Sequence, residues 1–144
     1  MNEFMQKLKK IALILAIVVL ASGSVWAYFA VREWSASKNQ RALAAEVDQL
    51  FEAFHKYKGI VGKYPSGSNS EIAKSIREGN NEKHLMFMAV RDSQLNAKGE
   101  IIDPWGTPLK IYFAQNEVLI RSAGPNKQFE DAKATLSDDY FRSD

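Results

Sequence analysis

The stretch DPWGTPLKIYFAQNEVLIRSAGPN, residues 103–126, decides how the second half of the chain folds. Its first four residues, Asp103, Pro104, Trp105 and Gly106, predict a structural turn. Proline fixes φ and cannot donate a backbone hydrogen bond, while the tryptophan supplies a large apolar anchor. Asp103 precedes the proline, and we expect its carboxylate to accept hydrogen bonds from the turn itself.

Two strands are predicted to follow this turn. Leu109, Ile111 and Phe113 alternate with other residues over 109–114, which is the period of a strand with one buried face. Residues 117–122 form the second predicted strand, in which Val118 and Ile120 alternate with Leu119 and Arg121. Gln115-Asn116 is predicted as the two-residue turn between them, because asparagine tolerates positive φ. A sheet of this kind must be covered on one face, and an amphipathic helix is the usual cover.

An amphipathic helix of this kind is predicted upstream. Apolar residues recur there at intervals of four and three, which places them on one helical face. They are Leu43, Val47, Leu50, Phe54 and Tyr57. Residues 59–69, rich in glycine and serine, predict a loop, and Ser70 to Glu78 a short capped helix. The apolar run His84–Val90 is compatible with either a strand or a helix.

The N-terminal part contains an uncharged run of 20 residues, IALILAIVVLASGSVWAYFA, from Ile11 to Ala30. A helix of this length rises about 30 Å, which matches the hydrocarbon thickness of a bilayer. The preceding lysines predict a cytoplasmic N-terminus and a translocated C-terminal part. A cleaved signal peptide, with Val25-Trp26-Ala27 as its cleavage pattern, is the alternative. The helical pattern that continues over 31–58 favours the anchor.

Composition restricts the classes of function. Residues 31–144 carry 16 basic and 16 acidic side chains, and such a neutral part does not provide the positive field that nucleic-acid binding needs. The chain has no cysteine, so a thiol nucleophile, a disulfide and a cysteine zinc site are excluded. It also lacks the HExxH, GxSxG and glycine-rich phosphate-loop motifs. We therefore expect no enzyme and no small-molecule substrate.

Several segments together resemble one known family. YKGIVGKYPSGSNSEIAKSI, GEIIDPWGTPLKIYF, IRSAGPNKQF and DDY occur in the order found in the globular domain of the major pseudopilins of type II secretion systems. The similarity covers about residues 40 to 141. It implies a pilin-like α+β fold, in which a long N-terminal helix, half in the membrane and half amphipathic, packs on a small antiparallel sheet with a C-terminal loop.

The resemblance also implies a function. It predicts a non-enzymatic structural component of a secretion or pilus-like apparatus, anchored in the inner membrane and working through contacts with other pseudopilin or apparatus subunits. The expected organisation is a basic N-terminus (1–10), a transmembrane helix (11–30), a helical neck and amphipathic helix (31–58) and a globular head (59–144). In major pseudopilins the C-terminal loop binds calcium, and the matching residues are Asn126, Asp138 and Asp139, with Glu130 and Asp131 between them.

One feature of that family is missing. Prepilins have a glycine cleavage site and a glutamate at mature position five, whereas Lys10-Ile11-Ala12-Leu13-Ile14-Leu15 has neither. This leaves a second hypothesis open, in which a tethered or exported binding module never enters a filament. Of the two histidines, His55 lies beside the apolar stripe and is predicted to be exposed.

Overall fold

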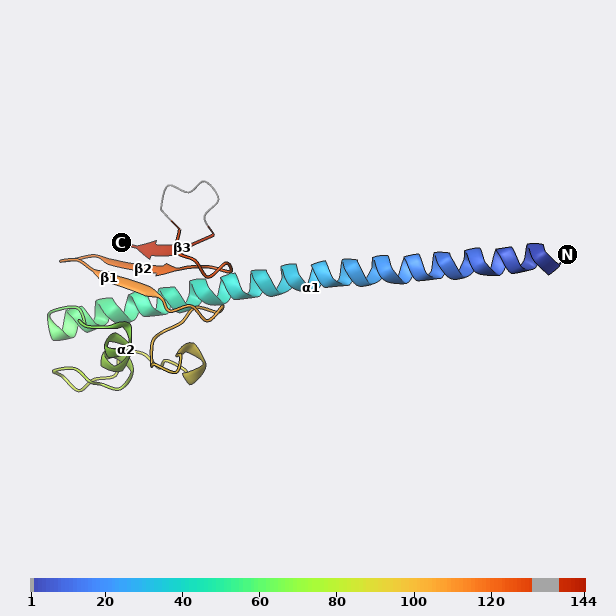
Figure 1. Ribbon diagram of the computed structural model, residues 1–144. Coiled ribbons are helices and arrows are strands. Elements are labelled where there is room, and N and C mark those ends of the chain that lie inside the picture. Colours follow the sequence, from blue (N-terminus) through green and yellow to red (C-terminus); the bar gives the residue numbers. More distant parts are fainter. Residues whose placement is uncertain (1, 131–137) are drawn as a thin grey trace. The chain divides into compact units, whose positions relative to one another are not determined.

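The computed structural model describes residues 2–130 and 138–144 of the chain, and the structural statements below refer to these residues. The chain divides into two compact units, Met1–Lys38 and Asn39–Asp144. Helix α1, Asn2–Val61, runs through the first unit and into the second (Figure 1).

The first unit consists of the N-terminal part of α1. Among the side chains that the structure describes, the large apolar ones from Leu13 to Trp34 are exposed. The hydroxyls of Ser22 and Ser24 donate to the carbonyl oxygens of Val19 and Leu20, at 2.9 and 2.8 Å. The helix thus satisfies these polar groups internally, as an apolar environment requires. Among the described residues, α1 is the one helix long and apolar enough to cross a membrane.

The second unit is built around the C-terminal part of α1. The predicted stripe is confirmed, because all five of its side chains are buried and belong to the core. Gly59 lies inside the helix, so the loop predicted to begin there starts later. The helix ends at Val61 because Gly62 adopts a φ of +90°, which stops the helical hydrogen-bond pattern.

The predicted hairpin is confirmed. Strands β1 (Lys110–Phe113) and β2 (Val118–Ser122) pair antiparallel, and β3 (Tyr140–Ser143) adds to β2 to give the order β1-β2-β3. Val118 and Ile120 are fully buried in the core. Gln115 and Asn116 connect the strands as expected, but Asn116 does not adopt positive φ, so that part of the prediction is wrong. Strand β3 was not predicted.

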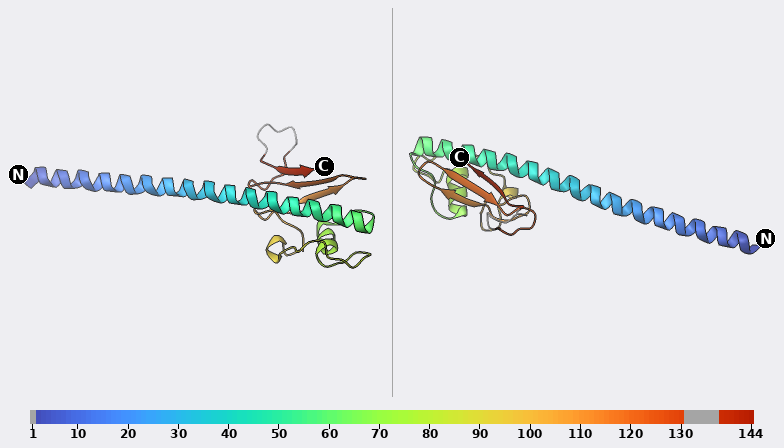
Figure 2. Two further views of the ribbon diagram at one scale, coloured as in Figure 1. Left: turned by 180° about the vertical axis from the view of Figure 1, so that it is seen from behind. Right: turned by 90° about the horizontal axis from the view of Figure 1, so that it is seen from above.

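A short helix, α2, spans Asn69–Arg77. Its N-cap is Ser68 and not Ser70 as predicted, because Ser68 forms a capping box with Glu71. The Ser68 backbone N–H donates to Glu71 Oε2 at 2.7 Å, and this bond is the largest cause of a lowered pKa of Glu71. The sheet packs against one side of α1, and α2 lies on another (Figures 1 and 2). Buried Ile72 and Ile76 join α2 to the shared core.

The run His84–Val90 forms neither a strand nor a helix. Its backbone touches α2 where the amides of Phe87 and Met88 both donate to Ile76 O. A 3-10 helix, Asp92–Gln94, and two isolated bridges then lead into the turn at residue 103. The observed architecture is therefore α+β, with one long helix, one short helix and a three-stranded antiparallel sheet among the described residues.

Candidate functional site

Asp103 is the centre of the turn that precedes β1. Its side chain is buried, and Oδ1 accepts the backbone amides of Trp105 at 3.0 Å and Thr107 at 2.9 Å. Gly106 completes the turn with a φ of +88°. Trp105 is partly buried and packs against the core. The turn is thus stabilised by the hydrogen bonds to the Asp103 carboxylate and by the packing of the Trp105 ring against the core.

The second oxygen of this carboxylate reaches the end of β2. Ser122 Oγ donates to Asp103 Oδ2 at 2.7 Å and accepts the backbone amide of Gly124 at 3.1 Å. Ser122 is fully buried. We call Asp103, Ser122 and Gly124 the corner network. It connects the turn, the last residue of β2 and the loop that follows β2 through three hydrogen-bonded groups.

The loop after the corner network approaches Asp138. A Cβ on Gly124 would lie 2.4 Å from the backbone oxygen of Asp138, so a side chain is sterically excluded there. The Asn126 amide donates to Asp138 Oδ2 at 3.2 Å. The corner network therefore also fixes where the predicted calcium-loop residues lie.

Three carboxylates converge at this loop. Ligand oxygens of Glu130, Asp138 and Asp139 all lie within 4.8 Å of one another. We call these three residues the acidic cluster. Two of them were predicted from the sequence. Glu130 was noted only as lying between them, together with Asp131, which lies outside the described residues.

The fit of the acidic cluster to calcium is partial. Calcium takes six to eight oxygen ligands at about 2.3–2.6 Å, and three carboxylates are suitable hard donors. Glu130 Oε2 is buried and has no hydrogen-bond partner among the described residues, which agrees with a site for a cation. However, Arg121 Nε already lies 2.6 Å from Asp139 Oδ2 and supplies a positive charge there.

Asn126 does not contribute an oxygen to the acidic cluster as it stands. Its Oδ1 accepts the backbone amide of Gln128 at 2.7 Å, and its Nδ2 donates to Glu130 Oε1 at 3.0 Å. The residues that would hold calcium are therefore the three carboxylates, with Asn126 as a supporting hydrogen-bond donor to Glu130.

His55 is partly exposed and has polar contacts that the sequence did not indicate. Its side chain is 38% exposed, and Nε2 lies 3.1 Å from Asp144 Oδ1. Nδ1 lies 2.9 Å from the backbone oxygen of Phe51. Arg142 of β3, two residues before Asp144, pairs with Asp48 of α1 at 3.1 Å, and its guanidinium group lies over the Phe51 ring. Strand β3 is thus joined to α1 by charged and aromatic contacts.

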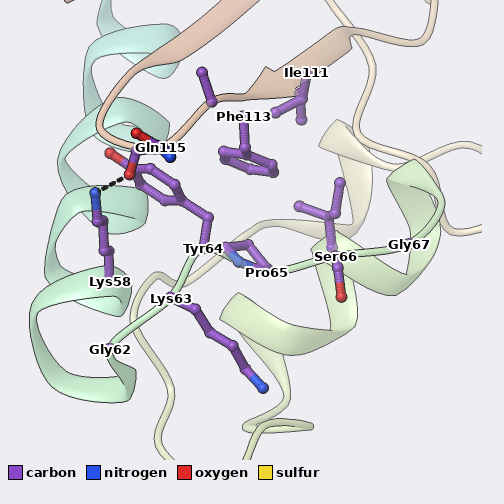
Figure 3. A pocket seen from close by; sticks show the side chains of 12 residues that line it. Lys58, Gly62, Lys63, Tyr64, Pro65, Ser66, Gly67, Ile111, Phe113 and Gln115 are labelled. Carbon is purple, nitrogen blue, oxygen red and sulfur yellow. Dashed lines mark hydrogen bonds between the residues drawn. The ribbon is translucent and has the colours of Figure 1, made fainter.

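A groove of about 470 Å³ lies between β1 and the loop that follows α1. Figure 3 shows Phe113 and Ile111 on one side of it, and Tyr64, Pro65 and Ser66 on the other. The Tyr64 ring stacks on the Phe113 ring with a centroid distance of 5.0 Å. Burial raises the pKa of the Tyr64 hydroxyl, with Asp144 as a smaller cause.

Comparison of the chain with protein-family models, with curated proteins and with solved structures finds no match.

Proposed function

We propose that this protein is a membrane-anchored, non-enzymatic structural subunit of a type II secretion or pilus-like apparatus, similar to a major pseudopilin. The observation that carries the proposal is that the two parts of α1 have different surroundings. Its first part presents apolar side chains outward over the length of a bilayer, and its second part is the core of a head with a three-stranded sheet. The sequence resemblance over residues 40–141 supports the pseudopilin-like assignment in this proposal.

The proposed topology follows from the charges at the N-terminus. Lys7, Lys9 and Lys10 precede the apolar run, with Glu3 as the one acid before it. Such a distribution favours retention of the N-terminus in the cytoplasm. The chain would then cross the inner membrane once and place residues 39–144 outside it, where they contact other subunits of the apparatus.

Calcium binding is the second element of this proposal. The acidic cluster would hold the ion, and the ion would tie the loop after β2 to β3 by neutralising three carboxylates. Arg121 would have to release Asp139 for full coordination, so we expect binding weaker than in a site whose carboxylates are all available.

A second candidate function is a tethered or exported binding module outside any filament. The absence of the family's glycine and glutamate from residues 10–15 favours it. The two candidates assume the same head. They differ in whether the N-terminus is processed and in whether the transmembrane helices of neighbouring copies contact one another.

The test uses the absence of cysteine from the natural sequence. Single cysteines are introduced at successive positions from 16 to 30, and disulfide formation is measured in native membranes. The subunit proposal predicts crosslinks that recur every three to four residues, because one face of each helix meets its neighbour. Uniformly absent crosslinks, with the protein still in the membrane fraction, would favour the tethered module.

Mass spectrometry of the mature protein completes the test. Expression with and without prepilin peptidase separates three outcomes. Cleavage near Lys10 supports filament use, whereas an intact chain supports a tethered protein. Cleavage after Ala27 would produce an exported head without an anchor and would contradict the subunit proposal.

A further inference from the structure

The edge of β1 that faces away from β2 carries unpaired backbone groups. Ala114 N donates to Glu117 O at 2.9 Å, which makes these two residues a hydrogen-bonded pair at the end of the hairpin. Hydrogen-bonded and non-hydrogen-bonded pairs alternate along an antiparallel ladder. In the observed register, Ile111 and Phe113 therefore direct their N–H and C=O groups to the other edge.

The residue just before β1 shows how this edge is used. Leu109 lies on the same edge, and its N–H donates to Ile101 O at 2.9 Å. Its carbonyl accepts Asn69 Nδ2 at 2.7 Å. Pairing stops there, and the edge groups of Ile111 and Phe113 have no hydrogen-bond partner in residues 2–130 and 138–144. An unpaired strand edge is a template for a further strand.

The groove of Figure 3 runs along this open edge, since Ile111 and Phe113 belong to its lining. Its lining is mixed, and its apolar groups include the rings of Tyr64 and Pro65 and the side chain of Ile72. A strand that paired with β1 would thus find a place for an apolar side chain beside its backbone. This combination is the one used when a peptide adds to a sheet.

The positive charge of the groove favours an acidic ligand. Lys58 and Lys63 line it, and none of its lining residues is acidic. Lys63 forms an ion pair with Glu82, whereas Lys58 Nζ donates to two uncharged oxygens, Gln115 O and Asn116 Oδ1. Among the described residues, no carboxylate forms an ion pair with the Lys58 ammonium group. Strand β1 itself, Lys110–Phe113, has no acidic residue, so a second copy that paired its β1 with this edge would bring no carboxylate from that strand to Lys58, which disfavours a second copy as the occupant.

We infer that the open edge of β1 and the adjacent groove bind an extended, acidic segment of a different polypeptide by strand addition. The carboxylate of that segment pairs with Lys58, an apolar side chain enters the groove, and its backbone bonds to Ile111 and Phe113. This inference rests on the proposed function in that it specifies one of the contacts through which the subunit works.

The test measures amide hydrogen exchange by NMR on the full chain in lipid nanodiscs. The probe is a peptide of sequence TVTET, blocked at both ends, in which valine and glutamate point to the same face, and its uncharged match is TVTQT. At nine-tenths saturation with TVTET, exchange of the Ile111 and Phe113 amides is expected to slow about tenfold. TVTQT is expected to bind about fivefold more weakly, because one partly exposed ion pair is lost.

Matched variants separate the groove from general charge effects. Lys58→Gln is expected to remove the preference for TVTET, whereas Lys110→Gln, an equal loss of charge on the outer face of β1, keeps it. No slowing at millimolar peptide, equal affinity for both peptides, or equal loss in both variants would overturn the inference. So would slowing of these amides on raising the protein concentration alone, which would show self-pairing. Because the nanodisc sample reports anchoring independently, failure to bind peptide leaves the proposed function standing.

Discussion

Replacing Asp103 by alanine is the most informative perturbation of the head, because three donors converge on this carboxylate. The amides of Trp105 and Thr107 and the hydroxyl of Ser122 would lose their acceptor. Each unsatisfied buried donor costs about 1–3 kcal/mol. The two amides belong to partly buried residues and fall at the low end, whereas Ser122 is fully buried. We expect Asp103→Ala to lower the free energy of unfolding by about 3–5 kcal/mol.

The matched variant is Ser122→Ala. It removes one hydrogen bond to Asp103 and leaves the Gly124 amide without its acceptor, at a cost of about 2–3 kcal/mol. Because both residues belong to the corner network, the double variant should be less destabilised than the sum of the two. We expect a coupling energy of about 1–2 kcal/mol, typical of residues in one network.

The assay is urea unfolding of the full chain in detergent micelles. The chain has three tryptophans, so Trp26 and Trp34 are replaced by phenylalanine and Trp105 remains as the reporter of the head. A loss below about 1 kcal/mol for Asp103→Ala, or strictly additive single and double variants, would refute the reasoning, since either would mean that the network is not a cooperative unit.

The remaining predictions concern the head as well. Burial raises the pKa of Glu46 above its ordinary value of 4.5, so the ionised form of this side chain destabilises the folded state. Glu46→Gln should therefore raise the free energy of unfolding at pH 7. Because the carboxyl group is neutral in both states at low pH, this gain should vanish below about pH 4.5, as urea unfolding would show. Gly124→Ala should destabilise it by about 2–4 kcal/mol, since φ is +65° and the new Cβ meets the Asp138 backbone, whereas an unchanged unfolding midpoint would contradict that geometry. If calcium binds, 1 mM calcium should raise the melting temperature of the natural chain and leave that of Asp138→Asn unchanged, as scanning calorimetry with a magnesium control would show.

Local patterns were sufficient to predict the parts of the fold that depend on neighbouring residues. The spacing of Leu43, Val47, Leu50, Phe54 and Tyr57 identified the buried face of α1, and alternation identified β1 and β2. Both signals arise because one side of a regular element contacts the core. The helix signals around residues 68–71 were correct in kind, although the cap lies two residues earlier than predicted.

The features that the sequence did not reveal depend on distant partners. Strand β3 has four residues, and its pairing with β2 joins residues that are distant in the sequence. His55 meets Asp144 only because β3 returns to α1. Glu130 joins the acidic cluster for the same reason, and the free edge of β1 is visible only once the register is known. The hydrophobic pattern of neighbouring residues carries no information about such contacts between distant parts of the chain.

The most direct test of the central claim is the accessibility of single cysteines to a water-soluble maleimide in sealed inner-membrane vesicles. Leu20→Cys lies in the middle of the apolar run, and Gln115→Cys lies in the exposed hairpin turn of the head. We predict that Cys at position 20 reacts only after detergent is added, while Cys at position 115 reacts from the side of the membrane opposite the cytoplasm. Equal labelling of the two cysteines in intact vesicles would show that α1 is not in the bilayer and would contradict the account.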